Sequence, residues 1–117
     1  LRELPELALF ERYPESDPSW FGFLIRLTPR AGFTRNELAE HLESRGIQTR
    51  NLFAGNLTRH PCFETLREGC DYRVAGRLAN TDELMNYAFW IGLYPGMTEE
   101  KLAYMAETIR NFCRKSK

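Results

Sequence analysis

Apolar side chains alternate with other residues most clearly in two segments, which predict the strands of a small sheet. Residues 20–27 place apolar side chains at every second position and carry a largely apolar second face. Residues 89–94 form another apolar run that stops at Pro95-Gly96, a dipeptide typical of turns. A third, shorter strand is expected at 47–49. Because the two longer strands are apolar on both faces, the sheet is predicted to be covered on both sides, in part by another domain.

Capping signals predict three helices. Thr34 stands three residues before Glu37, the spacing of a capping box, so a helix should begin there and end near Gly46. Residues 80–83, Asn-Thr-Asp-Glu, predict the start of a short second helix. Thr98 is expected to cap the last helix. The apolar face of that helix is predicted to comprise Leu102, Met105, Ile109 and Phe112.

The order of these elements predicts the fold class. Residues 1–19 contain Pro5, Pro14 and Pro18, which exclude a continuous helix or a central strand, so this segment is expected to be a connector. Residues 20–117 then form one domain with the order β-α-β-loop-α-β-α. This order indicates an α+β two-layer sandwich, with a small, mainly antiparallel sheet and helices on one face.

Composition and charge narrow the function classes. The chain has 117 residues, 43% of them hydrophobic and 27% charged, which is typical of a folded domain. Basic and acidic residues number 16 each, so no net charge favours nucleic acid or an anionic membrane as a partner. No apolar run approaches the ~20 residues of a membrane-spanning helix. We expect a cytoplasmic protein and, because the chain starts at Leu1 rather than Met, a fragment of a longer polypeptide.

Cysteine and histidine positions give little support for catalysis or metal binding. Cys62, Cys70 and Cys113 match neither a disulfide framework nor the spacing of a zinc or iron–sulfur site, so reduced thiols and no metal are expected. His41 is expected on the exposed face of the first helix. His60 lies in an irregular loop, where a turn role and a substrate contact are equally supported.

One loop is the strongest candidate site. No glycine-rich phosphate fingerprint occurs, but residues 49–59 follow a strand and combine arginines, asparagines and an aromatic ring. Such a set can hold a phosphate, sugar hydroxyls and a planar ring. A capped surface loop, with Phe53 as its core anchor, remains an open alternative. The candidate pocket residues are Arg50, Asn51, Phe53, Gly55, Asn56 and Arg59.

Aromatic residues in the two strands allow two readings. Trp20, Phe21, Trp90 and Tyr94 can form a platform on which a sugar or a base stacks. Their strand spacing favours packing in the core or at an interface instead.

Several blocks of sequence together resemble a known family. Residues 19–23, 47–57, 80–82 and 89–96 resemble, in order, the C-terminal small domain of the DegT/DnrJ/EryC1/StrS aminotransferase family. The likeness is greatest to its CDP-4-keto-6-deoxyglucose 3-dehydrase branch, which acts in lipopolysaccharide biosynthesis, and it spans residues 19–113. The resemblance implies the fold of the aspartate aminotransferases (fold type I). In that fold a large domain holds the B6 cofactor, and active sites form at the interface of a homodimer.

The resemblance also implies a chemistry. Most family members transfer an amino group to a keto sugar nucleotide, using a cofactor lysine. The dehydrase branch uses pyridoxamine phosphate with a histidine in place of that lysine. It removes the C-3 oxygen of a CDP-keto-deoxyhexose with a [2Fe-2S] cluster and an NADH-dependent iron–sulfur flavoprotein reductase. These features belong to the large domain, so no catalytic residue and no cofactor are expected in this chain, and the fragment alone is expected to be inactive.

Carried over by position, the resemblance brings residues 50–56 to the active site. Phe53 falls where transaminating relatives tend to have a polar residue such as histidine, which favours the dehydrase branch. His60 departs from the family pattern, in which glutamine is expected. Two alternatives stay open: the small domain of a pyridoxal-phosphate-dependent keto-sugar-nucleotide aminotransferase, and a non-catalytic interaction module.

Overall fold

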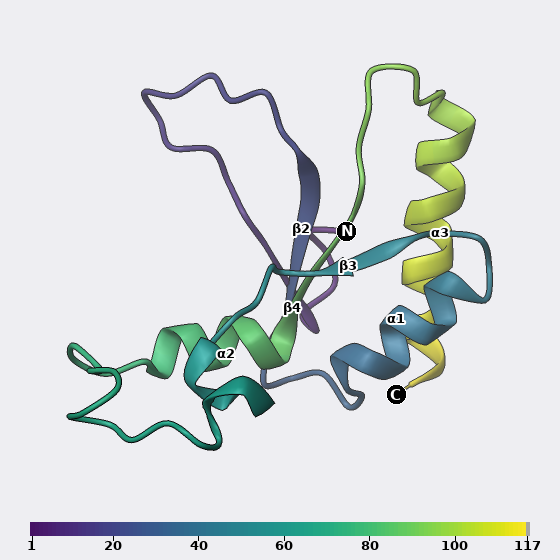
Figure 1. Ribbon diagram of the computed structural model, residues 1–117. Helices are drawn as coiled ribbons and strands as arrows, with labels where there is room; N and C mark the ends of the chain where they lie inside the picture. Colours follow the sequence, from purple (N-terminus) through teal and green to yellow (C-terminus); the bar gives the residue numbers. More distant parts are fainter. Residues whose placement is uncertain (117) are drawn as a thin grey trace.

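A four-stranded antiparallel sheet backed by helices forms the body of the protein (Figure 1). The computed structural model describes residues 1–116. The strand order is β1-β2-β4-β3, with β1 at Leu7–Leu9, β2 at Gly22–Leu27, β4 at Ala88–Gly92 and β3 at Thr49–Asn51. The helices are α1 (Arg35–Glu43), α2 (Ala79–Tyr87) and α3 (Glu99–Lys115), with short 3₁₀ turns at Leu57–Arg59 and Pro61–Phe63. The predicted α+β class with a small antiparallel sheet is confirmed.

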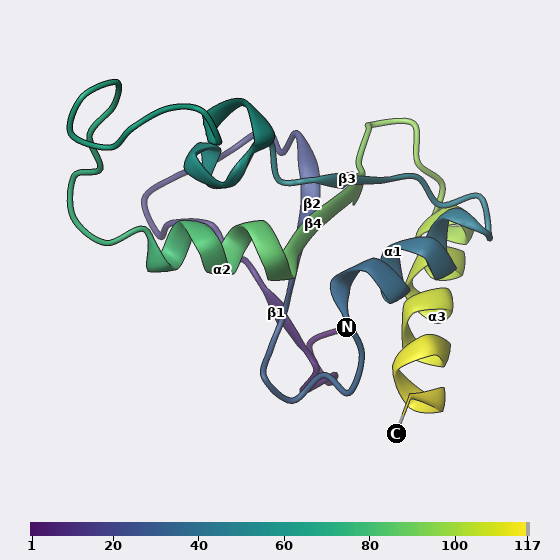
Figure 2. The same cartoon turned by 60° about the horizontal axis from the view of Figure 1, so that its bottom comes forward.

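One face of the sheet carries the hydrophobic core. The β2–β4 register pairs Ile25 with Phe89 and Phe23 with Ile91, and alternate residues of a strand share a face. Helices α1 and α3 cover this face, with Leu38 and Ile109 fully buried against it (Figure 2). The buried cluster comprises Leu4, Leu7, Ile25, Leu27, Leu38, Leu42, Ile47, Phe89, Ile91, Ile109 and Cys113.

The opposite face of the sheet is left open by α1 and α3. It presents Gly22, Leu24, Arg50 and Trp90, which alternate with the core residues along their strands. Helix α2 lies beyond the end of the sheet, where Glu83 pairs with Arg26 of β2. The apolar strands predicted that both faces of the sheet are covered. The described residues do not supply a cover for the second face. A second covering domain stays a prediction.

Strand β1 lies inside the segment expected to be a connector. Leu7–Leu9 pairs with residues 25–27 of β2 at the edge of the sheet. The prolines of this segment do exclude a central strand, but an edge strand tolerates them because one of its sides makes no ladder bonds. The division at residue 19 stays a prediction.

Local capping signals have mixed outcomes. The capping box of α1 is confirmed, since Thr34 Oγ1 accepts from the Glu37 N–H at 3.2 Å and Glu37 Oε2 accepts from the Thr34 N–H at 2.6 Å. The cap expected at 80–83 is wrong. Leu78 already has near-helical backbone angles (φ −92°, ψ 21°), so α2 begins at Ala79 without a side-chain cap.

The last helix extends past the sheet. Thr98 caps α3 as predicted, accepting from the Lys101 N–H at 3.3 Å, and Ile109 is buried. Leu102, however, is 46% exposed, because the first turns of α3 rise beyond the sheet edge (Figure 1). No helix in the described part of the chain is long and apolar enough to cross a membrane.

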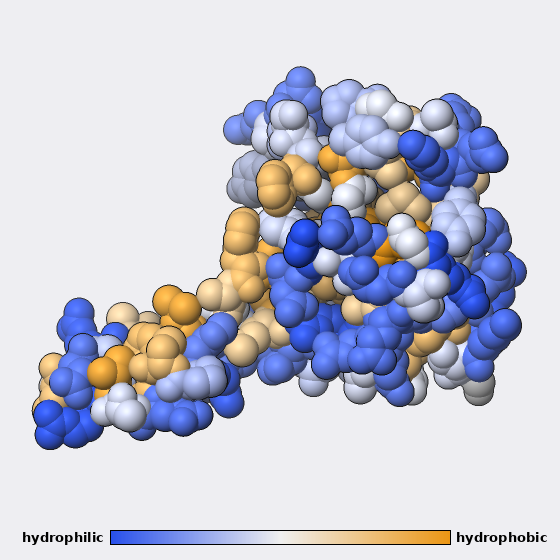
Figure 3. Space-filling view, turned by 45° about the vertical axis from the view of Figure 1, so that its right-hand side comes forward, coloured by the Kyte–Doolittle hydropathy of each residue, from blue (hydrophilic) through white to orange (hydrophobic). Residues whose placement is uncertain are grey.

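Residues 57–78 form an arm that projects from the body. The molecule measures 53 × 36 × 24 Å, and Figure 3 shows the arm as an extension with apolar groups on its surface. Within the arm, the rings of Phe63 and Tyr72 form an edge-to-face pair with centroids 5.0 Å apart. Leu57 and Leu66 remain exposed on it.

Candidate functional site

The loop after β3 holds an aromatic residue in an unusual backbone conformation. Phe53 has a φ of 46°, in the left-handed region, and its side chain is 78% exposed. A bulky residue in this region costs about 1–2 kcal/mol, so the surrounding structure must enforce the conformation. The alternative in which Phe53 anchors the loop in the core is therefore wrong.

Trp90 of β4 supports Phe53 from the open face of the sheet. The two rings meet edge to face, with centroids 4.9 Å apart and planes at 82°. Phe21, 77% exposed, approaches the same indole at 5.1 Å and 60°. Edge-to-face pairs of this kind stabilise by about 0.5–1.5 kcal/mol beyond area burial. Trp90 is thus the centre of a surface aromatic cluster, Phe21–Trp90–Phe53.

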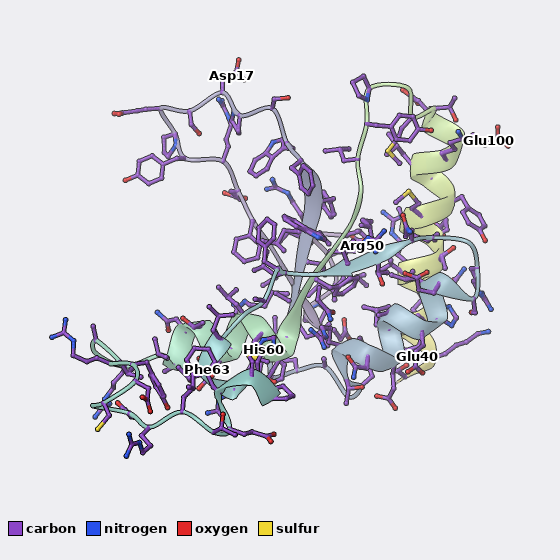
Figure 4. All side chains as sticks on the ribbon, viewed as in Figure 1. Asp17, Glu40, Arg50, His60, Phe63 and Glu100 are labelled. Atoms are coloured by element: carbon purple, nitrogen blue, oxygen red, sulfur yellow. The ribbon has the colours of Figure 1, made fainter. Side chains whose placement is uncertain are left out.

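Arg50 projects from β3 beside this cluster (Figure 4). It lies opposite Trp90 in the β3–β4 register and makes no ion pair with other described residues. Arg50 and two rings of the cluster, Phe21 and Trp90, border a hollow of about 230 Å³, which also involves Gly22, Gly92 and Tyr94. A cation next to aromatic walls suits an anionic ligand with a planar ring.

Glu43 fixes the start of β3. Its carboxylate accepts hydrogen bonds from the backbone N–H and the hydroxyl of Thr49, at 2.5 and 2.9 Å. These bonds, first the backbone one, and then the charge of Arg50, lower the pKa of Glu43. The strand that carries Arg50 is therefore tied to the end of α1.

A polar network ties the far end of the loop to α2. Asn56 is buried, and its Nδ2 donates to Asp82 Oδ1 at 2.6 Å while its Oδ1 accepts from the Thr58 N–H at 3.1 Å. Arg59 donates to both oxygens of Asp82, at 2.7 and 2.8 Å. The Arg59 bonds, followed by the Asn56 bond, lower the pKa of Asp82, and Asp82 in turn raises the pKa of Arg59. Asn56 and Arg59, both predicted site residues, thus form their hydrogen bonds with other residues of the protein.

Gly55 lets the loop approach α2 closely. Its φ is 63°, and a Cβ there would lie 2.6 Å from Met85 Cγ. Nearby, His60 Nε2 lies 2.5 Å from the Ala54 carbonyl oxygen. This contact favours the turn role for His60 over the substrate contact.

His41 is not on an exposed helix face, and that prediction is wrong. Its ring packs on Phe112 with centroids 4.7 Å apart, and its Nε2 is buried without a hydrogen-bond partner in the described structure. Desolvation, followed by the charges of Arg45 and Lys115, lowers the pKa of His41. The periodicity pointed outward, but the C-terminal turns of α3 pack over this side of α1.

The predicted site residues therefore separate into two groups. Arg50 and Phe53 meet the aromatic cluster on the open face, whereas Gly55, Asn56 and Arg59 hold the loop on α2. Asn51 ends β3, exposed, opposite Phe89. Sequence reasoning assigned Trp90 to packing and gave no role to Gly92. The alternation of residues 88–92 places Trp90 and Gly92 on one face of the strand. This alternation was the signal in the sequence that could have identified them as site residues.

The side chains able to ligate a metal are dispersed over the described residues. No three metal-ligating side chains gather within residues 1–116. Cys62 and Cys70 are exposed, and Cys113 is buried in the core. Lys101 donates to Tyr94 Oη at 3.0 Å and Lys115 is exposed, so neither offers the desolvated amine that a pyridoxal phosphate site needs.

Comparison with known proteins identifies the family. The model of the DegT/DnrJ/EryC1/StrS aminotransferase family matches residues 1–110. The chain belongs to this family. A dTDP-4-dehydro-2,6-dideoxy-D-glucose 3-dehydratase of Saccharopolyspora spinosa is 50% identical over 99% of this chain and 24% of the relative. The lipopolysaccharide biosynthesis protein RfbH of Salmonella typhimurium is 49% identical over 91% of this chain and 23% of its own length. The chain thus spans about a quarter of the length of these DegT-family relatives.

Solved structures of the DegT family share the fold. A mutant GDP-4-keto-6-deoxymannose-3-dehydratase with bound GDP-perosamine matches 92% of this chain and 27% of its own, with a TM-score of 0.76 and 25% identity. The Escherichia coli GDP-4-keto-6-deoxy-D-mannose-3-dehydratase with bound hydrated PLP gives a TM-score of 0.77 at 24% identity, over 92% of this chain and 26% of its own. The family resemblance read from the sequence blocks is confirmed.

Proposed function

We propose that this chain is the C-terminal small domain of a pyridoxamine-phosphate-dependent nucleotide-sugar 3-dehydrase in deoxysugar and lipopolysaccharide biosynthesis. In this role the open sheet face closes over the sugar nucleotide, orients it and excludes water. Residues 1–19 connect to the large domain, and residues 20–117 form the small domain. The 50% identity to a named sugar 3-dehydratase, over 99% of the chain, supports the reaction class.

The conformation of Phe53 carries the proposal. Phe53 is exposed and held at φ 46°, and its ring contact with Trp90 about offsets the backbone strain but gives it no further packing role. Arg50 beside it makes no ion pair with other described residues. A ligand-facing wall gives Phe53 a role. We assign Phe53 and Trp90 to the wall and Arg50 to the diphosphate. Asn51 is exposed at the end of β3 but alternates with Arg50 onto the other side of the strand, so we assign it to the cofactor surroundings and not to the wall.

Gly55, Asn56 and Arg59 act behind this wall as positioning residues. Their contacts to Met85 and Asp82 fix the path of the loop on α2. A shift of this anchorage would move Phe53 and Arg50 together. These residues thus contribute to the pocket without contacting the substrate.

The cofactors and partners belong to the rest of the protein. Pyridoxamine or pyridoxal phosphate supplies the electron-accepting ring for bond cleavage next to a carbonyl carbon. We propose that the large domain holds it together with a [2Fe-2S] cluster, in a cytoplasmic homodimer served by an NADH-dependent iron–sulfur flavoprotein reductase. The nucleotide of the substrate is CDP in this proposal. Relatives named for dTDP and GDP sugars support a nucleoside-diphosphate sugar more generally.

A keto-sugar-nucleotide aminotransferase is the second candidate. It is favoured by the description of the family as an aminotransferase family. Phe53 argues against it, because transaminating relatives tend to have a polar residue such as histidine at this position.

Product analysis of the full-length protein tests the proposal. The protein is incubated anaerobically with a CDP-4-keto-6-deoxy sugar, a reductase and NADH, and in a second reaction with glutamate as amino donor. Mass spectrometry should find loss of the C-3 oxygen in the first reaction and no aminated sugar in the second. An aminated product without deoxygenation would replace the dehydrase with the aminotransferase.

A further inference from the structure

The hollow on the open face has the shape and lining of a nucleobase site. Gly22 and Gly92 face each other directly in the β2–β4 register, and the Trp90 side chain lies over Gly22, where a Cβ would be 3.6 Å from Trp90 Cδ2. Gly92 is exposed, and a Cβ there would meet no heavy atom within 4 Å. Gly92 therefore leaves a bare glycine strip of backbone beside the Trp90 side chain, onto which a flat ring can settle.

Aromatic side chains stand around this strip. Phe21 and Trp90 border it, and their rings already meet edge to face at 5.1 Å, while Tyr94 closes the side toward α3. Phe21 is 77% exposed, an arrangement that packing inside the described residues does not require. Stacking on exposed rings of this kind binds any nucleobase, since every base has a π-face.

The polar groups of the hollow lie at one end. Gln48 and Arg50 alternate with Thr49 along the start of β3, so both point to the open face and enter the lining. An arginine at the rim suits the diphosphate of a nucleotide, and a neutral amide suits a base edge. The charge arrangement thus matches an apolar planar ring that carries an anionic group on one side.

We infer that the hollow over Gly22 and Gly92 seats the base of the nucleoside diphosphate, with Arg50 at its phosphates. This inference rests on the proposed function and adds the part of the substrate that the small domain recognises. With the base at the glycine strip and the phosphates at Arg50, the sugar extends past Trp90 toward Phe53. A domain with this base site binds a nucleotide sugar in preference to a free sugar phosphate, which has no base.

Filling the strip tests the inference without disturbing the fold. Gly92→Val in the full-length protein adds a branched side chain where the structure has open space, so thermal unfolding should be unchanged or shifted upward. The probes are dTDP, CDP and GDP, and inorganic pyrophosphate as a ligand without a base. Isothermal titration calorimetry should find the nucleoside diphosphate that the wild type binds weakened about tenfold or more, and pyrophosphate unchanged.

Two further variants serve as comparisons for Gly92→Val. Arg50→Gln should weaken pyrophosphate and nucleoside diphosphate alike, since it removes the charge and leaves the strip open. Ala8→Val is the matched control, because Ala8 lies on the same sheet face opposite Arg26, at the other end of β2. It should bind all probes as the wild type does. If Gly92→Val lowers the melting temperature, Gly92→Ala takes its place, with a smaller loss expected.

The outcomes separate this inference from the proposed function. Wild-type affinity for the nucleoside diphosphate in a folded Gly92→Val protein would overturn the base site and leave the dehydrase proposal standing. A wild-type protein that binds none of the three nucleoside diphosphates would overturn both. Equal weakening of pyrophosphate by Gly92→Val would also overturn the base site, because the strip would then act on the phosphates.

Discussion

Phe53 is the residue at which backbone strain and proposed substrate contact coincide. Its left-handed backbone is unfavourable for a residue with a Cβ, yet its ring gains an edge-to-face contact with Trp90. The motif around it was visible in the sequence, but its exposure was not, because an apolar residue in a loop is more often an anchor in the core. Backbone angles at a single position follow from long-range contacts that a sequence pattern does not contain.

Replacing Phe53 separates strain from function. Phe53→Gly should leave the stability nearly unchanged, since relief of about 1–2 kcal/mol of backbone strain offsets the lost ring contact of about 0.5–1.5 kcal/mol. Phe53→Ala keeps the strain and should be less stable than Phe53→Gly. Both variants should lower kcat/KM of the full-length enzyme about tenfold, as measured by steady-state kinetics beside thermal melts. Full activity in both would remove Phe53 from the site.

Asn56 should contribute more to the free energy of unfolding than Arg59, which binds the same carboxylate of Asp82. Asn56→Ala removes a buried side chain and its bonds to Asp82 and Thr58, and should lower the free energy of unfolding by about 1–3 kcal/mol. Arg59→Ala should cost less, because the Arg59 side chain is 62% exposed to water. Urea denaturation of both variants checks the order. The reverse order would show that the ion pair, and not the amide, holds the loop.

His41 should make stability depend on pH near neutrality. Its folded pKa lies below the ordinary 6.5, because burial and the charges of Arg45 and Lys115 disfavour the cation. The unfolded chain therefore binds the proton first, so stability is full above pH 6.5 and falls as pH drops through the folded pKa. Urea titrations between pH 5 and 8 should find this decline in the wild type. His41→Leu should abolish it, and an unchanged decline in that variant would assign the effect to another group.

At the scale of elements, short-range signals were dependable and long-range ones were not. The capping box of α1 and the Thr98 cap of α3 depend on residues a few positions apart, and both were predictable. Strand β1 was not, because an edge strand of Leu7–Leu9 exists only through its pairing with β2. The start of α2 was misplaced for a similar reason. Asp82, read as a helix-start signal, accepts hydrogen bonds from Asn56 of the loop after β3 and from Arg59 of the arm.

Two glycines allow the packing of the loop on α2 to be measured. Gly46→Ala should lose about 1–2 kcal/mol, because its φ is 74° but a Cβ there meets nothing within 4 Å. Gly55→Ala should lose more, by about 1–3 kcal/mol, since its Cβ would also clash with Met85 at 2.6 Å. Met85→Ala in the Gly55→Ala background should recover part of the extra loss. Equal melting temperatures for the two single variants would contradict the close contact.

At the scale of the molecule, the described residues leave one face of the sheet open. One sheet face is covered by α1 and α3, and the other exposes Phe21, Phe53 and Trp90 around Arg50. The sequence indicated this, because its two main strands are apolar on both faces, but it could not tell which face the helices would leave open. That choice follows from the register of β2 with β4, which places Ile25 opposite Phe89 on the helix side.

The chain by itself should bind to copies of itself and lack activity. The exposed aromatic cluster predicts concentration-dependent association in sedimentation velocity, and Phe21→Lys should reduce it. Turnover of a CDP-keto sugar by residues 1–117 should be undetectable, because in the proposed protein the large domain holds the cofactor. Measurable turnover by this segment would contradict the assignment of the cofactor to the rest of the protein.

The absorption spectrum of the purified full-length protein tests the central claim most directly. A nucleotide-sugar 3-dehydrase of the proposed type should show the broad visible envelope of an iron–sulfur cluster together with the near-ultraviolet band of pyridoxamine phosphate. A lysine-bound pyridoxal band without iron would place the protein among the aminotransferases of its family. Absence of any B6 band would contradict both, and with them the account of the open sheet face as a wall of the active site.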